Sequence, residues 1–215
     1  MRTRRLVLKE RDWAEASGFA DERGWPEQPV EDSGTGRKSR VWTVNEDSVS
    51  VGEGAVFVDE DSVFVGEDVV FQVTRDRDSG EFCCFFSGSH HLFSGSHHDE
   101  LVRLLEDAEQ ALDVWQIAEL LGAPYEETNP RRLAQSIFRL GLGAPPVNTA
   151  EFMPPLAFAM AHAQPIVRGA AARTTAYMEW PELVPILEVM AEHDVDDRVR
   201  AEARKIVSVY RAVLG

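Results

Sequence analysis

The chain has 215 residues, 44% of them hydrophobic and 27% charged, an ordinary globular composition that excludes a disordered or fibrous chain. Asp and Glu number 37 against 22 Lys and Arg, so the formal net charge is −15. This balance disfavours a protein held on nucleic acid or anionic lipid by a basic surface. We therefore expect no nucleic acid and no membrane as partners. We expect a protein partner instead, and a basic one, because acidic surfaces attract basic ones.

Three features of the composition indicate a bacterial, cytoplasmic protein. Cys83 and Cys84 are adjacent, and a bond between strand neighbours that point to opposite faces would be strained, so we expect a reducing compartment or no redox role for them. The basic N-terminus is not followed by an apolar secretion segment, and no apolar run is long enough to span a membrane. Arg outnumbers Lys by 19 to 3, which is typical of a GC-rich coding sequence.

The first elements alternate between strand and helix patterns. Leu6-Val7-Leu8 predicts a strand, and the apolar spacing of residues 11–23 predicts a helix that Gly24 ends. Residues 26–40 contain two Pro, two Gly and several charges, and we interpret them as an exposed loop. A β-branched and aromatic run at 40–44 predicts a second strand.

An internal repeat follows this strand. Residues 46–57 (EDSVSVGEGAVF) and 60–71 (EDSVFVGEDVVF) match at nine of twelve positions. Each copy is interpreted as a short strand, a Gly-Glu turn and a second short strand, so the pair predicts a meander of hairpins. The nearly continuous apolar run at 81–86 predicts a strand that is central in the sheet.

A second, shorter duplication separates the two halves of the chain. FSGSHH occurs at 86–91 and again at 93–98, and its Gly and Ser content predicts a loop over 85–98. Ser96 followed by Asp99 predicts a capping box at the start of a helix.

Helical periods dominate from Asp99 onward. Breakers such as Gly122 with Pro124 and the pair Pro145-Pro146 separate seven expected helices. Helices this short cannot bury an apolar face alone and must stack on one another. Their expected ranges are 99–110, 113–122, 130–141, 151–162, 166–178, 181–193 and 197–213.

The last two helix pairs resemble each other in sequence. Pro154, Leu156 and His162 recur at one common offset as Pro185, Leu187 and His193. Val167-Arg168 and Ala171 recur as Val199-Arg200 and Ala203, at an offset one position larger. A single inserted residue in the turn accounts for the change of offset. We expect Val167, Ala171, Val199 and Ala203 to be buried between the helices, because residues four apart share one helix face.

This pattern resembles the HEAT-repeat family, an armadillo-like α-solenoid. The family signature is a Pro in the first helix, an acidic turn, and then Val-Arg and a small residue on the second helix. Asp196, Asp197, Val199, Arg200 and Ala203 fit it, whereas Gln164 and Pro165 replace the acidic turn upstream. Farther upstream, Val114 with Ala118 and Leu133 with Ile137 keep only the spacing. An unclassified helical bundle is the structural alternative.

We therefore expect an α+β fold in two domains. Residues 1–95 would form a small antiparallel β-rich domain with a duplicated hairpin, and residues 96–215 an all-α, HEAT-like array of helical hairpins.

The histidines and cysteines raise the question of a metal site. His90, His91, His97 and His98 lie near Cys83 and Cys84, but their spacing matches no standard zinc site and comes from one duplicated hexapeptide. His162 and His193 occupy equivalent repeat positions near helix ends, which favours a structural role. No nucleophile elbow, phosphate loop or metalloprotease motif is present. We therefore expect no metal, no cofactor and no enzymatic activity.

The acidic stretch 45–68 contains eight carboxylates and no basic residue. Acidic turns can simply keep hairpin edges soluble, but they can also form an anionic patch that docks a basic partner. On the second interpretation the partner-binding residues are Asp59, Glu60, Asp61, Glu67 and Asp68.

The sequence predicts a non-enzymatic protein-binding module. Acidic charge, small size and the lack of catalytic groups suggest an immunity or inhibitor-type protein that masks a basic partner. Two alternatives stay open: a nucleic-acid repair enzyme built on HEAT helices, which would need a basic groove, and a scaffold subunit of a larger complex.

Overall fold

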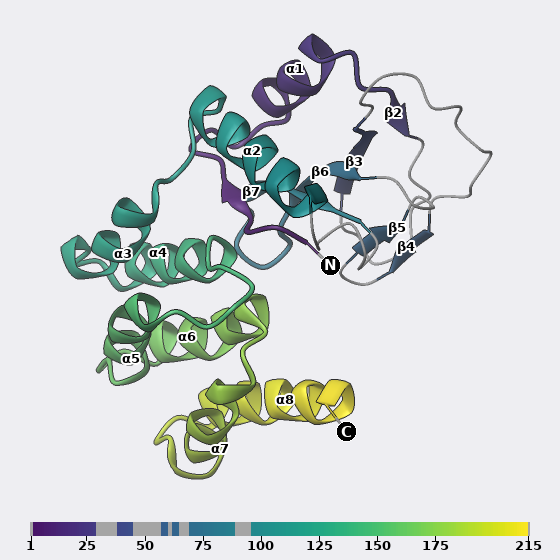
Figure 1. The fold of residues 1–215 in the computed structure, drawn as a ribbon. Coiled ribbons are helices and arrows are strands. Elements are labelled where there is room, and N and C mark those ends of the chain that lie inside the picture. The colour runs from purple at the N-terminus through teal and green to yellow at the C-terminus, as the bar shows by residue number, and fades with distance from the viewer. Residues whose placement is uncertain are drawn as a thin grey trace. The chain divides into compact units, whose positions relative to one another are not determined.

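A computed structural model describes residues 2–28, 38–44, 57–59, 62–64, 69–88 and 96–214 (Figure 1). The chain divides into two compact units, Met1–Trp115 and Gln116–Gly215. The described residues combine a five-stranded antiparallel sheet with eight α-helices, so the fold is α+β.

The first unit is built on the sheet, whose strand order is β1-β7-β6-β3-β2. These strands are β1 (Leu6–Val7), β2 (Glu27–Gln28), β3 (Lys38–Thr43), β6 (Val70–Arg75) and β7 (Phe82–Ser87). The apolar strand β7 lies between β1 and β6 and is buried along its whole length, so it is not an edge strand, although β6 and not β7 is the middle strand of the sheet.

Two helices, α1 (Ala14–Glu22) and α2 (Ser96–Ala111), pack on one face of this sheet. Phe71 of β6 lies at the centre of the core and contacts the rings of Phe19, Trp25, Trp42 and Phe86. The helix α1 ends before Gly24, whose φ of +67° suits a residue without a side chain, as its sequence position predicted.

The prediction of a loop over residues 26–40 is wrong at both ends of that range. Glu27 and Gln28 pair with Trp42 and Val41, and β3 begins at Lys38. The Arg40 guanidinium donates two hydrogen bonds, of 2.7 and 2.6 Å, to the carboxylate of Glu27. This bidentate pair and the backbone pairing hold β2 on the edge of the sheet.

The repeat is described only in part. Strands β4 (Phe57–Asp59) and β5 (Ser62–Phe64) pair antiparallel, with Phe57 opposite Phe64. This pairing joins the end of the first copy to the start of the second. The Gly-Glu turns that we expected within each copy lie outside the described residues.

The duplicated FSGSHH segment is not a loop at its two ends. Strand β7 continues to Ser87, and α2 begins at Ser96. The side chain of Ser96 lies outside the described residues, so the expected capping box stays a prediction.

Helix α2 belongs to the first unit, although the sequence placed residues from 96 onward in the helical part. Its apolar residues Leu101 and Ala108, and Leu112 just after it, lie in the same core cluster as the sheet. The backbone then pairs with β1, since Val114 forms a bridge with Leu8 and the Trp115 N–H donates to the Val7 carbonyl. The unit boundary therefore falls after Trp115.

The second unit consists of three helical hairpins. The first helices are α3 (Ile117–Glu126), α5 (Met153–Met160) and α7 (Val184–His193), and the second helices are α4 (Pro130–Leu142), α6 (Pro165–Met178) and α8 (Asp197–Leu214). The second helices pack in the order α4, α6, α8, and each packs on the first helix of its own hairpin. Short 3₁₀ turns, η2 (Ala150–Phe152) and η3 (Pro181–Leu183), lead into α5 and α7.

The expected helix over 113–122 requires correction. It begins at Ile117, because Val114 is part of the bridge to Leu8, so Val114 cannot match a helical repeat position. It also continues through Pro124 to Glu126, and Pro124 is buried within it. The other expected helices of the second unit agree with the structure to within a few residues.

Candidate protein-binding surface

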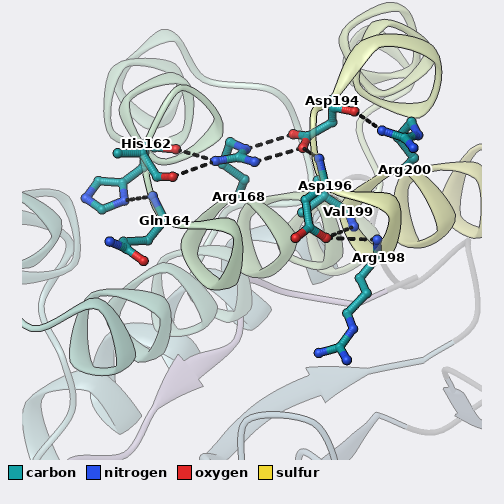
Figure 2. A network of polar contacts seen from close by, with 9 residues as sticks. His162, Gln164, Arg168, Asp194, Asp196, Arg198, Val199 and Arg200 are labelled. Atoms are coloured by element: carbon teal, nitrogen blue, oxygen red, sulfur yellow. Dashed lines mark hydrogen bonds and ion pairs between the residues drawn. The ribbon is translucent and has the colours of Figure 1, made fainter.

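The turns of the last two hairpins are joined by a buried ion pair. The Arg168 side chain, 10% exposed, donates from Nε and Nη2 to the two carboxylate oxygens of Asp194, each at 2.8 Å (Figure 2). Its Nη1 donates to the carbonyl oxygens of His162 and Ala163 at 2.8 and 2.9 Å. One side chain of α6 therefore fixes the turn of its own hairpin and that of the next.

This contact keeps both partners charged. The hydrogen bond from Arg168 lowers the pKa of Asp194, against the opposing effect of burial. The same hydrogen bond raises the pKa of Arg168. Because the named partners of Arg168 all lie in the two turns, the arrangement links the hairpins.

The last hairpin repeats part of the arrangement. Asp196 caps α8, since its carboxylate accepts hydrogen bonds from the backbone N–H groups of Arg198 and Val199 at 2.9 and 3.3 Å. Arg200 occupies the place on α8 that Arg168 has on α6, directly after the buried valine. It contacts the carbonyl oxygen of Asp194 (Figure 2). It also contacts the carboxylate of Asp197.

In the second unit, the Lys and Arg residues lie only on the second helices of the hairpins. Every Lys and Arg of Gln116–Gly215 lies on a second helix, α4, α6 or α8, and none lies on a first helix. Apart from His193, the ionisable side chains of the first helices and of the 3₁₀ turns before them that carry charge are acidic. These are Glu119, Glu126, Glu151, Glu182, Glu188 and Glu192.

Large apolar side chains are exposed on the same first helices. Tyr125, Phe158 and Val189 are 54%, 42% and 57% exposed, and we call them the first-helix row. The rings of Tyr125 and Phe158 lie 5.2 Å apart between centroids, so α3 and α5 contribute to one patch. Val189 follows Phe158 at the same offset that separates Leu187 from Leu156, and it therefore occupies the equivalent place on α7.

The first-helix row is the best candidate site among the described residues. Exposed aromatic side chains commonly mark protein interfaces, where they supply apolar contact area. Acidic residues at the edge of such a patch attract a basic partner and speed its association. The row therefore offers apolar contact area on a layer of helices that carries Glu residues and no Lys or Arg.

The sequence did not identify this row. It contained one usable signal, the repeat of helix pairs that relates Phe158 to Val189. Which side of each helix stays exposed depends on the packing of neighbouring hairpins, and periodicity alone does not report that packing.

The predicted acidic site is not assembled by the described residues. Asp59 lies at the end of β4, opposite Ser62, and its side chain lies outside the described part. Glu60, Asp61, Glu67 and Asp68 also lie outside it. The acidic hairpins therefore stay a prediction.

Only some of the candidate metal ligands lie within the described residues. Cys83 and Cys84 are both buried, and burial raises the pKa of Cys84 well above its ordinary value. His90 and His91 lie outside the described residues, as do the side chains of His97 and His98. Within the described ranges, no three His, Cys, Asp or Glu residues are grouped to hold a metal ion. His162 Nδ1 accepts a hydrogen bond from the Gln164 N–H at 3.1 Å, a local turn contact.

Comparison with known proteins finds no matching family model, no matching curated protein and no matching solved structure. None of the described helices combines the length and the apolar composition needed to cross a membrane.

Proposed function

We propose that this chain is a non-enzymatic, cytoplasmic protein-binding module of the immunity or inhibitor type, which masks a basic partner protein. The observation that carries the proposal is the first-helix row, whose exposed apolar side chains lie on helices without Lys or Arg, two of which, α3 and α7, carry Glu residues. The proposal includes no cofactor, and it makes the partner a protein rather than nucleic acid or a membrane.

We propose further that the second unit is a HEAT-like array. Two successive hairpins repeat the order of a 3₁₀ turn, a first helix and a second helix, with η2 and η3 at equivalent places. Val167, Ala171, Val199 and Ala203 are all buried, as the repeat requires. The Arg168–Asp194 pair supports the same interpretation, because it links equivalent turns of adjacent hairpins.

The first test measures binding of a basic probe. The probe is a labelled amphipathic helix of Lys and Leu, about 18 residues or roughly 27 Å long, so that it can span more than one hairpin. Phe158→Ser should weaken binding about tenfold, equivalent to ~1.4 kcal/mol, because it removes a central apolar contact. Fluorescence anisotropy measures the affinity.

Val195→Ser provides the matched control. Val195 is 89% exposed in the turn between α7 and α8, outside the first-helix row, so its replacement should leave the affinity unchanged. Equal affinities for the wild type and Phe158→Ser would refute the row as the binding surface. An equal loss in both variants would indicate non-specific adsorption to exposed apolar residues and would also contradict the proposal.

The acidic hairpins are tested separately with the same probe. Replacing Asp59, Glu60, Asp61, Glu67 and Asp68 by Lys should slow association strongly at low salt and weakly at high salt. Circular dichroism checks that the fold is retained. An association rate that is unchanged at low salt would remove the hairpins from the proposal and leave the first-helix row as the candidate surface.

A further inference from the structure

The second helices α4, α6 and α8 expose a repeated surface that carries basic side chains, whereas the first helices carry none of the Lys and Arg residues. Leu133, Val167 and Val199 are buried near the start of α4, α6 and α8. Ile137, Ala171 and Ala203 are buried four residues later. The three helices therefore present the same side to their neighbours, and their outward sides are equivalent as well.

Two rows of residues follow from this equivalence, and we call them the second-helix rows. The residues directly before the first buried positions are Arg132, Ile166 and Arg198. The residues two places after the second buried positions are Arg139, Arg173 and Lys205. Arg139 is half-buried and the other five residues are exposed.

The rows are spaced regularly because the helices are. Members of the two rows on one helix are seven residues apart, which is roughly 10 Å along a helix axis. Packed helices lie about 8–10 Å apart, so members of one row on adjacent helices have a similar spacing. Five cationic side chains thus form a two-row array across the three second helices.

Few acidic side chains lie on the same three helices. Helices α4 and α6 contain no Asp or Glu, and α8 contains only Asp197 and Glu202. Asp197 contacts Arg200, which is outside the rows. Glu202 contacts Arg173, with Nε and Oε1 2.8 Å apart, and therefore shows that a carboxylate can be bound at a row position.

We propose that the second-helix rows bind an acidic segment of a partner protein, through a surface separate from the first-helix row. Charge complementarity supports an acidic ligand. Ile166, 49% exposed, lies in line with Arg132 and Arg198 and offers an apolar contact that a protein side chain would use and a phosphate backbone would not. The net charge of −15 also disfavours a long polyanion more than a short acidic segment.

The probe for this surface is a labelled amphipathic peptide of Glu and Leu. Its affinity should fall at least tenfold when Arg132, Arg198 and Lys205 are all replaced by Gln, and the salt dependence of binding should become weaker. The matched control replaces Arg75, Arg77 and Arg103, three exposed arginines of the first unit, by Gln. It changes the net charge equally and should leave the affinity unchanged.

Three outcomes would overturn the inference. The first is equal affinity of the wild type and the row variant, and the second is an equal loss in the control variant. The third is tighter binding of a DNA duplex than of the Glu/Leu peptide with the same dependence on the three residues, which would assign the rows to nucleic acid. The basic Lys/Leu probe should bind the row variant normally, so failure here is distinguishable from failure of the proposed function.

Discussion

Gly141 of α4 faces Thr174 of α6 so closely that no side chain fits between them. A Cβ at position 141 would overlap the Thr174 Cγ2 and would lie 2.9 Å from the Thr174 carbonyl oxygen. Thr174 is fully buried, and its hydroxyl donates to the carbonyl oxygen of Ile137 at 3.1 Å. The two second helices therefore meet at a glycine, and the contact sets how closely the first two hairpins stack.

Gly141→Ala should destabilise the helical unit by about 1–3 kcal/mol, because the added methyl group forces apart helices that are fixed by backbone contacts. Gly122→Ala is the matched control, since nothing lies within 4 Å of a Cβ at Gly122 in α3. That variant should be stabilised by up to about 1 kcal/mol through helix propensity. Urea unfolding measures both, and two changes of the same sign would contradict the close contact.

Asp194→Asn tests the link between the last two hairpins. The substitution keeps the size of the side chain but leaves the Arg168 cation without its carboxylate in a site where both side chains are at most 10% exposed. We expect a loss of about 2 kcal/mol in the free energy of unfolding. Glu192→Gln, at a side chain 72% exposed, should change it by less than about 0.5 kcal/mol. Equal stabilities of the two variants would mean that the buried pair contributes nothing.

The same pair predicts a pH dependence. The pKa of Asp194 is lower in the folded chain than its ordinary value of 3.8, so its contribution is complete above that value. It is lost as the pH falls through the lowered pKa. The stability difference between the wild type and Asp194→Asn should therefore be constant near neutral pH and shrink below about pH 4. A difference that stays constant down to the acid transition would contradict the assigned pKa direction.

Local patterns predicted most of the helical unit. The helix expected over 130–141 occupies Pro130–Leu142, since Asn129 caps it by accepting hydrogen bonds from the N–H groups of Arg131 and Arg132. Pro130 supplies a favourable first position. Both residues lie at the start of the helix, so these signals can be recognised from the local sequence alone.

Contacts between distant residues explain what the sequence did not predict. Val114 has helical spacing to Ala118, but its backbone pairs with Leu8, and no local pattern contains that partner. The exposure of Phe158 likewise depends on how α3, α5 and α6 pack. The charge total of the chain likewise does not report that every Lys and Arg of the second unit lies on a second helix.

We also predict that the chain does not depend on zinc. The paired histidines at 90–91 and 97–98 have no standard ligand spacing. Metal analysis of the purified protein after treatment with a chelator should find less than stoichiometric zinc, and the unfolding curve should be the same before and after the treatment. Stoichiometric zinc that survives dialysis would overturn the prediction.

Ala203→Arg tests the repeat that relates the last two hairpins. Ala203 is fully buried on α8, four residues after the buried Val199. An arginine there would place a charge without a partner in the contact between helices, so the helical unit should fail to fold. Ala212→Arg is the control, because Ala212 is exposed on the same helix and the substitution adds the same charge and volume. We expect the control to be expressed and to unfold like the wild type. Circular dichroism and thermal unfolding of both variants measure the difference, and an Ala203→Arg variant that melts like the wild type would show that this face of α8 is not packed against its neighbours.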